Sequence, residues 1–151
     1  MNGVVGGVKE SLAVLLDIQR NYNQILKRTS RRHGLTTAEW QLLKKVTAGY
    51  NTQNQLVAET KLDVSTLSRQ LSRLVEKKLL LIKKLDDRPS LTARKKYSYQ
   101  VTNRGNDSLT AMGTDLQKMK DDLFSPWTQD EQNLLKILLN RLNTSFDRLE
   151  S

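Results

Sequence analysis

The stretch that decides the fold is DVSTLSRQLSRLVEKK, residues 63–78. Its apolar residues recur at steps of three and four, which predicts an amphipathic helix with these residues on one side: Val64, Leu67, Leu71, Leu74 and Val75. Asp63 is in position to cap its first turn. The other side has no acid before Glu76 and carries only short hydroxyls and arginines: Ser65, Ser68, Arg69, Ser72 and Arg73. Solvated helix faces usually mix both signs of charge. The composition of this face therefore favours a role in contacting phosphates and base edges over the alternative of a surface helix that is merely basic.

The residues before this helix predict a second, shorter one. Thr52 and Gln55 have the spacing of a capping box, and the apolar residues Leu56 and Val57 follow before the helix ends around Thr60. Two short helices joined by a tight turn, the second of them basic, form the helix-turn-helix pattern. The turn here reads TKLD and lacks the glycine often found at this point.

The residues after the helix predict a β-hairpin with a basic tip. An apolar run at 79–82 and an alternating run at 96–101 flank a segment with turn residues and Pro89. Residues 83–96 contain six lysines and arginines against Asp86 and Asp87. A basic hairpin can simply protect a sheet edge, but its place directly after a helix-turn-helix favours a wing that touches DNA.

Helices are predicted at both ends of the chain. Residues 8–28 carry a wide apolar stripe, and this helix closes at Gly34. The next predicted helix begins at LTTAEW, residues 35–40, where Thr36 and Glu39 have the spacing of a capping box, and it stops near Gly49. We interpret Trp40 as a core anchor.

Toward the C-terminus, residues 102–124 repeat apolar positions at steps of three and four. Thr128 and Glu131 then open a last amphipathic helix. These helices have more apolar surface than a winged helix of about 70 residues can cover. We therefore expect a homodimer built from the two chain ends, with a self-contained helical subdomain as the alternative.

Composition excludes several classes of protein. A chain of 151 residues predicts a single domain. It has no cysteine, which excludes disulfides, thiolate metal sites and cysteine redox switches, and a single histidine, His33, cannot form a metal site alone. No apolar run approaches 18 residues and no signal peptide is visible, so we expect a cytoplasmic protein without a membrane span. No nucleophile–base cluster or glycine-rich phosphate loop indicates an enzyme or a cofactor.

The positive charge is concentrated in the middle of the chain. Residues 61–104 contain 12 Lys/Arg against 4 Asp/Glu, whereas residues 105–151 contain 5 against 8. A basic block of this kind attracts polyanions over about a Debye length.

The order of predicted elements, with three motifs, resembles the MarR family of bacterial winged-helix transcription regulators. LTTAEW is similar to the start of the family's second helix, and residues 56–74 match its spacing LAxxLxxSxxTVSRxLxxL without a gap. Residues 101–105, VTNRG, are similar to the Leu-Thr-x-x-Gly that leads out of the wing. The chain departs from the family where Lys78 replaces a usual glycine and in a wing about six residues longer than usual.

The resemblance implies a mainly α fold with a small β-hairpin wing. The winged helix would cover about residues 35–102, and the dimerisation helices about 8–30 and 103–150, within a single MarR-like domain at 1–151. It also implies a homodimer that binds a pseudo-palindromic operator in double-stranded DNA, usually as a repressor, and that is released by a small molecule. The missing cysteines argue against a peroxide sensor and the single histidine against a metal sensor, so any effector would be an organic molecule. Four residues lie near the junction where the family's ligand pockets occur, although a structural role is the better interpretation of each: Arg31, Arg32, His33 and Trp40.

The residues expected to bind DNA come from three segments. Arg69 and Arg73 are candidates for reading guanine, because a guanidinium can bond O6 and N7 together, although one of them could hold a phosphate instead. Ser65, Thr66 and Ser68 lie near the helix start, and Thr52 and Gln53 lie at a helix N-terminus that suits phosphate. The family's wing carries Asp-x-Arg, whose arginine enters the minor groove. Counted forward from the recognition helix this motif falls at Asp86-Asp87-Arg88, and counted back from Thr102 it falls at Ala93-Arg94-Lys95, where the aspartate is missing. Arg88 is therefore favoured as the matching residue, and Arg94 and Lys95 are candidates for groove or phosphate contact.

Two rival functions share these features. A sequence-independent architectural DNA-binding protein would have the same charge and the same dimer but little base readout. A winged helix used for protein contact is disfavoured by the lack of acids on the recognition face.

Overall fold

The computed structural model describes residues 7–84 and 97–150 and has six helices and one hairpin within them. In chain order these are α1 (Ser11–Arg32), α2 (Thr37–Thr47), α3 (Gln53–Thr60), α4 (Val64–Glu76), β1 (Leu80–Lys84), β2 (Tyr97–Val101), α5 (Asn103–Leu123) and α6 (Gln129–Glu150). The prediction of a mainly helical fold with a small hairpin is confirmed. Helix α1 begins and ends later than the predicted range of 8–28.

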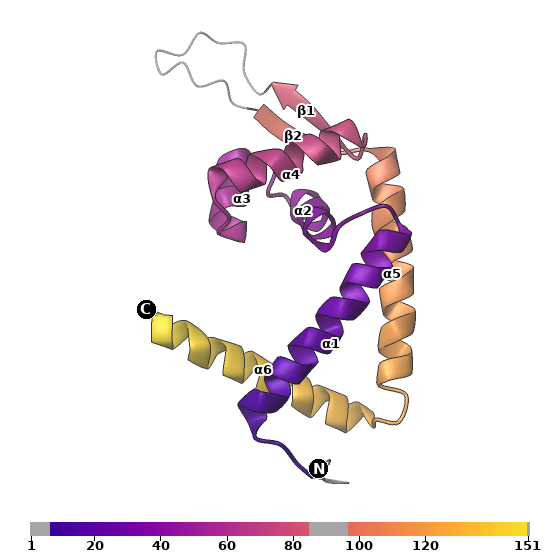
Figure 1. Cartoon of the computed structure of the whole chain (residues 1–151), viewed down its shortest axis with the longest axis vertical. Coiled ribbons are helices and arrows are strands. Elements are labelled where there is room, and N and C mark those ends of the chain that lie inside the picture. The colour runs from indigo at the N-terminus through magenta and orange to yellow at the C-terminus, as the bar shows by residue number, and fades with distance from the viewer. Residues whose placement is uncertain (1–6, 85–96, 151) are drawn as a thin grey trace. The chain divides into compact units, whose positions relative to one another are not determined.

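The chain forms two compact units, Met1–Gly113 and Thr114–Ser151. In the first unit, α2, α3, α4 and the hairpin gather in one cluster (Figure 1). The core of this cluster is mainly aliphatic, because α2 contributes Leu42, Leu43 and Val46, α3 contributes Leu56, and α4 contributes Leu67, Leu71 and Leu74. Trp40 is also buried, which confirms its interpretation as a core anchor.

Three of the predicted capping boxes form. In each, the threonine hydroxyl accepts from the amide three residues later and that residue's side chain accepts from the threonine amide: Thr36 with Glu39, Thr52 with Gln55, and Thr128 with Glu131. These reciprocal bonds satisfy two otherwise unpaired donors at each helix start. The sequence signal and the helix starts therefore agree at α2, α3 and α6.

The C-terminal ends of α1 and α4 have the same pattern of backbone hydrogen bonds. After α1, the amide of Gly34 donates to Arg31 O and that of Leu35 donates to Ser30 O, the two bonds of a Schellman motif. The end of α4 has the same pair, from Lys78 to Val75 O and from Leu79 to Leu74 O. Lys78 adopts the left-handed conformation with φ of 62°, so a lysine occupies a position that glycine favours.

The turn between α3 and α4 follows the same rule. Lys61 has φ of 58°, and its amide donates to Val57 O. The left-handed residue is therefore present in the TKLD turn without the usual glycine. Asp63 then caps α4, because its Oδ1 accepts from the Thr66 amide at 2.7 Å.

The hairpin is an antiparallel pair in which Leu80 faces Val101 and Lys84 faces Tyr97. It is joined to the helix-turn-helix by residues 51 and 52, since the Tyr99 amide donates to Asn51 O at 2.8 Å and Thr52 bridges to Ser98. The sheet edge thus fixes the start of α3.

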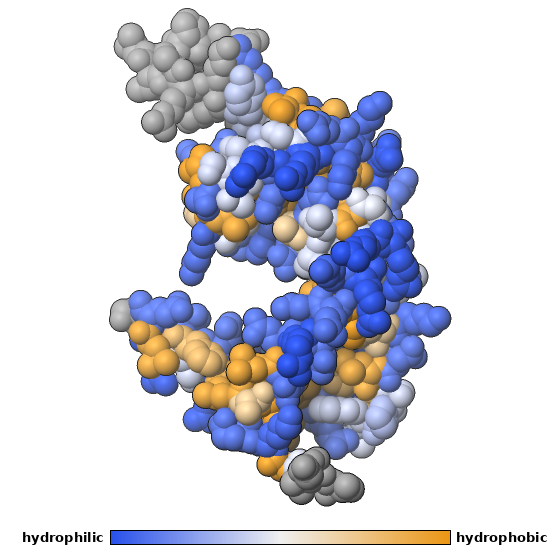
Figure 2. Space-filling view, in the orientation of Figure 1, coloured by the Kyte–Doolittle hydropathy of each residue, from blue (hydrophilic) through white to orange (hydrophobic). Residues whose placement is uncertain are grey.

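The second unit contains the C-terminal part of α5 and the whole of α6. The connection between these helices is held by an edge-to-face contact of Phe124 and Trp127, with ring centroids 5.1 Å apart. No residue of α6 is fully buried, and several of its large apolar side chains are exposed: Leu134, Ile137, Leu138, Leu139, Phe146 and Leu149. Figure 2 shows these residues as an apolar stretch along α6.

Candidate nucleic-acid interface

The exposed face of α4 is the centre of the candidate interface. Leu67, Leu71 and Leu74 are buried, as the sequence predicts, and hold the helix against the cluster. The side chains of Ser65, Arg69, Ser72 and Arg73 are exposed on the remaining surface. The face therefore has hydroxyls and guanidinium groups, with Glu76 at its far end as the first acid.

One residue of the predicted apolar side lies elsewhere. Val64 is 57% exposed, so the apolar side of the helix is not buried along its whole length. Val64 is the first residue of α4 and directly follows the Asp63 cap. The buried stripe therefore has no earlier helical residue beside Val64 and begins only at Leu67. Val64 belongs to the exposed N-terminal end of the helix.

The hydroxyl groups at this end differ in their hydrogen bonds. Ser65 Oγ donates to Asp63 Oδ1 at 2.9 Å, whereas Ser68 Oγ accepts from Gln53 Nε2 at 2.8 Å. The pKa of the Asp63 carboxyl is held below its ordinary value by the Thr66 amide first, then by the Ser65 hydroxyl, with the charge of Arg69 adding to the effect. Ser65 therefore presents lone pairs to solvent, and Ser68 retains a proton to donate.

The N-terminus of α3 lies beside α4 through the Gln53–Ser68 bond, so the structure brings these two predicted site residues together. Thr52 uses its oxygen to accept from the Gln55 amide at 3.2 Å. Its hydroxyl proton remains available to an incoming acceptor, and the first backbone amides of a helix have no acceptor within the helix. This end retains the donors that a phosphate requires.

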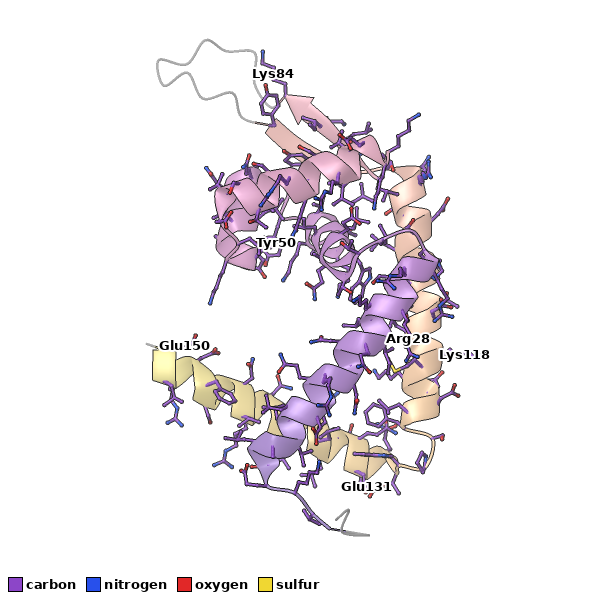
Figure 3. The ribbon with its side chains drawn as sticks, viewed as in Figure 1. Arg28, Tyr50, Lys84, Lys118, Glu131 and Glu150 are labelled. Carbon is purple, nitrogen blue, oxygen red and sulfur yellow. The ribbon has the colours of Figure 1, made fainter. Side chains whose placement is uncertain are left out.

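The hairpin adds positive charge beyond the DNA-binding residues that the sequence predicts. Lys83 and Lys84 end β1 with exposed side chains, and Figure 3 labels Lys84 at the far end of the strand. Both belong to the basic segment visible in the sequence. The predicted wing residues Arg88, Arg94 and Lys95 lie outside the described residues.

The C-terminal end of α4 is held in place by a buried carboxylate. Glu39 is 2% exposed, and its Oε1 accepts from the Thr36 amide and from Lys77 Nζ, each at 2.8 Å. Lys77 also donates to Gly34 O at 3.2 Å. Burial alone would raise the pKa of Glu39, but the Lys77 and Thr36 donors outweigh it and hold that pKa below its ordinary value.

The structure also bears on metal binding and on membrane spans. Among residues 7–84 and 97–150, no group of three or more His, Asp or Glu side chains could hold a metal ion. No helix in the described part of the chain is both long enough and apolar enough to cross a membrane.

These elements, a helix-turn-helix followed by a hairpin and flanked by long helices, define a winged helix-turn-helix with terminal helical extensions. No family model and no curated protein matches the sequence. Solved structures of MarR family transcription regulators do match it across nearly its full length.

One MarR family transcription regulator is 20% identical, with 92% of this chain and 89% of that chain covered and a TM-score of 0.81. Staphylococcus aureus MarR, solved in complex with salicylate and kanamycin, is 16% identical, with coverage of 91% and 90% and a TM-score of 0.78. S. aureus MepR, solved in complex with DNA, is 19% identical, with coverage of 92% and 99% and a TM-score of 0.74. The chain has the MarR-type fold, as the sequence resemblance predicts.

Proposed function

We propose that the protein is a sequence-specific DNA-binding transcriptional regulator in the cytoplasm, a repressor rather than an enzyme, which binds a pseudo-palindromic operator as a homodimer. The observation that carries this proposal is the exposed face of α4. It combines two arginines with hydroxyl groups on a helix whose opposite side is locked into a leucine core. The fold shared with MepR, which has been solved bound to DNA, supports it.

On DNA, α4 would enter the major groove, which is wide enough to admit a helix. Arg69 or Arg73 would bond guanine O6 and N7, and the start of α3 at Thr52 would hold a phosphate through its hydroxyl and free amides. The hairpin, with Lys83 and Lys84 and the predicted residues Arg88, Arg94 and Lys95, would reach the flanking minor groove, where A·T tracts are most negative.

The homodimer is supported by the apolar surface of α6. A monomer would leave six large apolar side chains of this helix in water, and exposed patches of this kind mark association surfaces. Exposed Leu12, Leu16 and Ile18 on α1 extend the argument to the other chain end. Twofold symmetry would then place two α4 helices in successive major grooves, roughly 34 Å apart.

Release by a small organic ligand is a further part of the proposal. A hollow of about 380 Å³ lies where α1 meets the start of α2, and it is lined by Asn23, Lys27, Arg31, Leu35, Thr36 and Thr37. The positively charged side chains of Lys27 and Arg31 in this lining suit an organic anion. The salicylate complex of S. aureus MarR, which has the same fold, supports this class of ligand.

The DNA-binding test begins with selection of a preferred site from random duplexes. Arg69→Ala should then weaken binding to that site by about 1–3 kcal/mol, with a smaller loss on random DNA. Arg28→Ala is the matched control, because it removes one exposed positive charge from α1 (Figure 3) and should change affinity by less than twofold. Equal losses on both DNAs would reject base reading by Arg69, and a wild type without a preferred site would favour the architectural alternative.

The dimer is tested by sedimentation equilibrium. Leu138→Glu places a charge in the apolar stripe of α6 and should shift the protein toward monomer. Lys136→Glu changes charge on the opposite side of the same helix and should leave the dimer intact. A wild-type protein that sediments as a monomer at micromolar concentration would overturn the homodimer.

A further inference from the structure

The N-terminal end of α4 presents an apolar side chain at the place where a recognition helix meets base edges. Val64 is 57% exposed there, while the other apolar residues of the first three turns, Leu67 and Leu71, are buried. More than half of Val64 is open to solvent, and its side chain has no charge or hydrogen-bond donor for a phosphate. What its methyl groups can offer to DNA is an apolar contact.

Ser68 lies one helical turn after Val64, so the two side chains are neighbours on the helix surface. Its Oγ accepts a hydrogen bond from Gln53 Nε2 at 2.8 Å, which fixes the oxygen toward α3. The hydroxyl proton must then point away from Gln53, toward another acceptor. Ser68 is thereby set as a donor beside the methyl groups of Val64.

A donor next to an apolar group matches one base edge in the major groove. Thymine has the O4 acceptor and the C5 methyl group side by side. Cytosine presents an amino donor and no methyl group, and neither purine has a methyl group there. We propose that Val64 and Ser68 together read a thymine in each half-site, with Gln53 as the residue that positions Ser68. This rests on the proposed function.

The neighbouring hydroxyl shows why Ser68 and not Ser65 carries this role. Ser65 donates its proton to Asp63 at 2.9 Å and so turns an acceptor outward. An acceptor beside O4 of thymine would be repelled.

The experiment uses the full chain and its selected DNA site. Each thymine is replaced in turn by deoxyuridine, which removes only the methyl group. At one thymine per half-site, wild-type affinity should fall about fourfold, the effect of one methyl group returned to water. In Val64→Ala this sensitivity should disappear, while Val75→Ala, the same truncation at the other end of α4, should retain it.

The Ser68 donor is tested at the same position with 5-methylcytosine opposite guanine. This base keeps the methyl group but replaces the acceptor with an amino donor. Wild-type affinity should fall about tenfold, because two donors then face each other. Ser68→Ala should bind both sites within twofold, and Gln53→Ala should show an intermediate preference.

The outcomes separate this inference from the function on which it rests. If wild-type protein prefers its selected site but Val64→Ala keeps the full uridine effect, or no thymine is sensitive, the reading of thymine is wrong. If the wild type has no preferred site at all, the proposed function itself fails.

Discussion

The ion pair between Glu39 and Lys77 offers a direct test of how burial changes the energy of a charge pair. Replacing Lys77 with methionine keeps a long unbranched side chain but removes the charge. Glu39 would then keep the Thr36 amide as its donor on Oε1, and its Oε2 is already buried without a partner among the described residues. The carboxylate would be left largely uncompensated in the core.

The expected loss follows from the exposure of the two side chains. Removing one partner from a fully buried pair costs about 3–5 kcal/mol, whereas an exposed pair contributes about 0–1 kcal/mol. Glu39 is 2% exposed and the Lys77 side chain is 41% exposed, so water screens one partner only. We expect Lys77→Met to lower the free energy of unfolding by about 1.5–3 kcal/mol at pH 7.

The chain offers a matched control. Lys45 and Glu59 form an ion pair of 2.7 Å, nearly the same length as the 2.8 Å pair of Lys77 and Glu39, but its two side chains are 38% and 33% exposed. Lys45→Met should therefore cost no more than about 1 kcal/mol. Both variants are compared with the wild type by urea denaturation at one fixed protein concentration, since a dimer's stability depends on concentration. Equal losses in the two variants would refute the argument from burial.

The pH dependence supplies a second readout. The pKa of Glu39 in the folded protein is lowered, so its stabilising contribution is present above the unfolded value of about 4.3 and is lost as pH falls through the folded-state pKa. The difference in stability between the wild type and Lys77→Met should therefore be largest near neutral pH and shrink below about pH 4. A difference that stays constant down to acid pH would assign the loss to packing instead of charge.

Three further substitutions test the backbone of the winged helix and of α5. A Cβ at Gly105 would lie 2.4 Å from Leu79 O and 2.7 Å from a Val101 methyl carbon, so Gly105→Ala should cost about 1–3 kcal/mol by urea denaturation. Gly113→Ala in the same helix meets no atom within 4 Å and should instead stabilise by about 0.5–1 kcal/mol; a loss there comparable to that at position 105 would contradict the steric explanation. Lys78→Gly relieves a left-handed residue and should raise the melting temperature by a few degrees, for a net gain of about 0.5–1 kcal/mol, and an unchanged or lower value would count against backbone strain at this position.

The helix starts were predictable because their signals are local. A capping box needs only two residues three positions apart, and Thr36, Thr52 and Thr128 each begin the helix that their spacing predicts. The helix-turn-helix and the hairpin followed from short-range periodicity in the same way. The basic candidates on α4 were identified for the same reason, since the buried leucines left Arg69 and Arg73 on the outer face.

What the sequence missed depends on contacts between distant segments. Glu39 was recognisable as a capping residue, but its bond to Lys77, 38 positions away, depends on how α2 packs against α4. Gly105 is visible in the sequence only as part of the VTNRG motif, whereas the reason for a glycine there is Leu79 O, which would lie 2.4 Å from an added Cβ. Val64 fits the helical period yet is exposed, because periodicity gives a direction around the helix and not the extent of the core beneath it.

These long-range contacts together hold α4 at both ends, and this bears on the proposed reading of DNA by this helix. Asp63 caps its start, Gln53 reaches its second turn, and at its C-terminus Lys77 is bonded to Glu39 while Lys78 O accepts from Thr102 Oγ1 at 2.7 Å. A helix fixed in this way loses little conformational freedom when it enters a groove, so more of its contact energy remains as affinity. The same rigidity makes the hydroxyl directions meaningful, because a serine that turned freely could donate to one base as readily as it accepted from another. In the proposed complex with DNA, base selectivity at the start of α4 would therefore depend on α3 and α2 as well as on the side chains that touch the base.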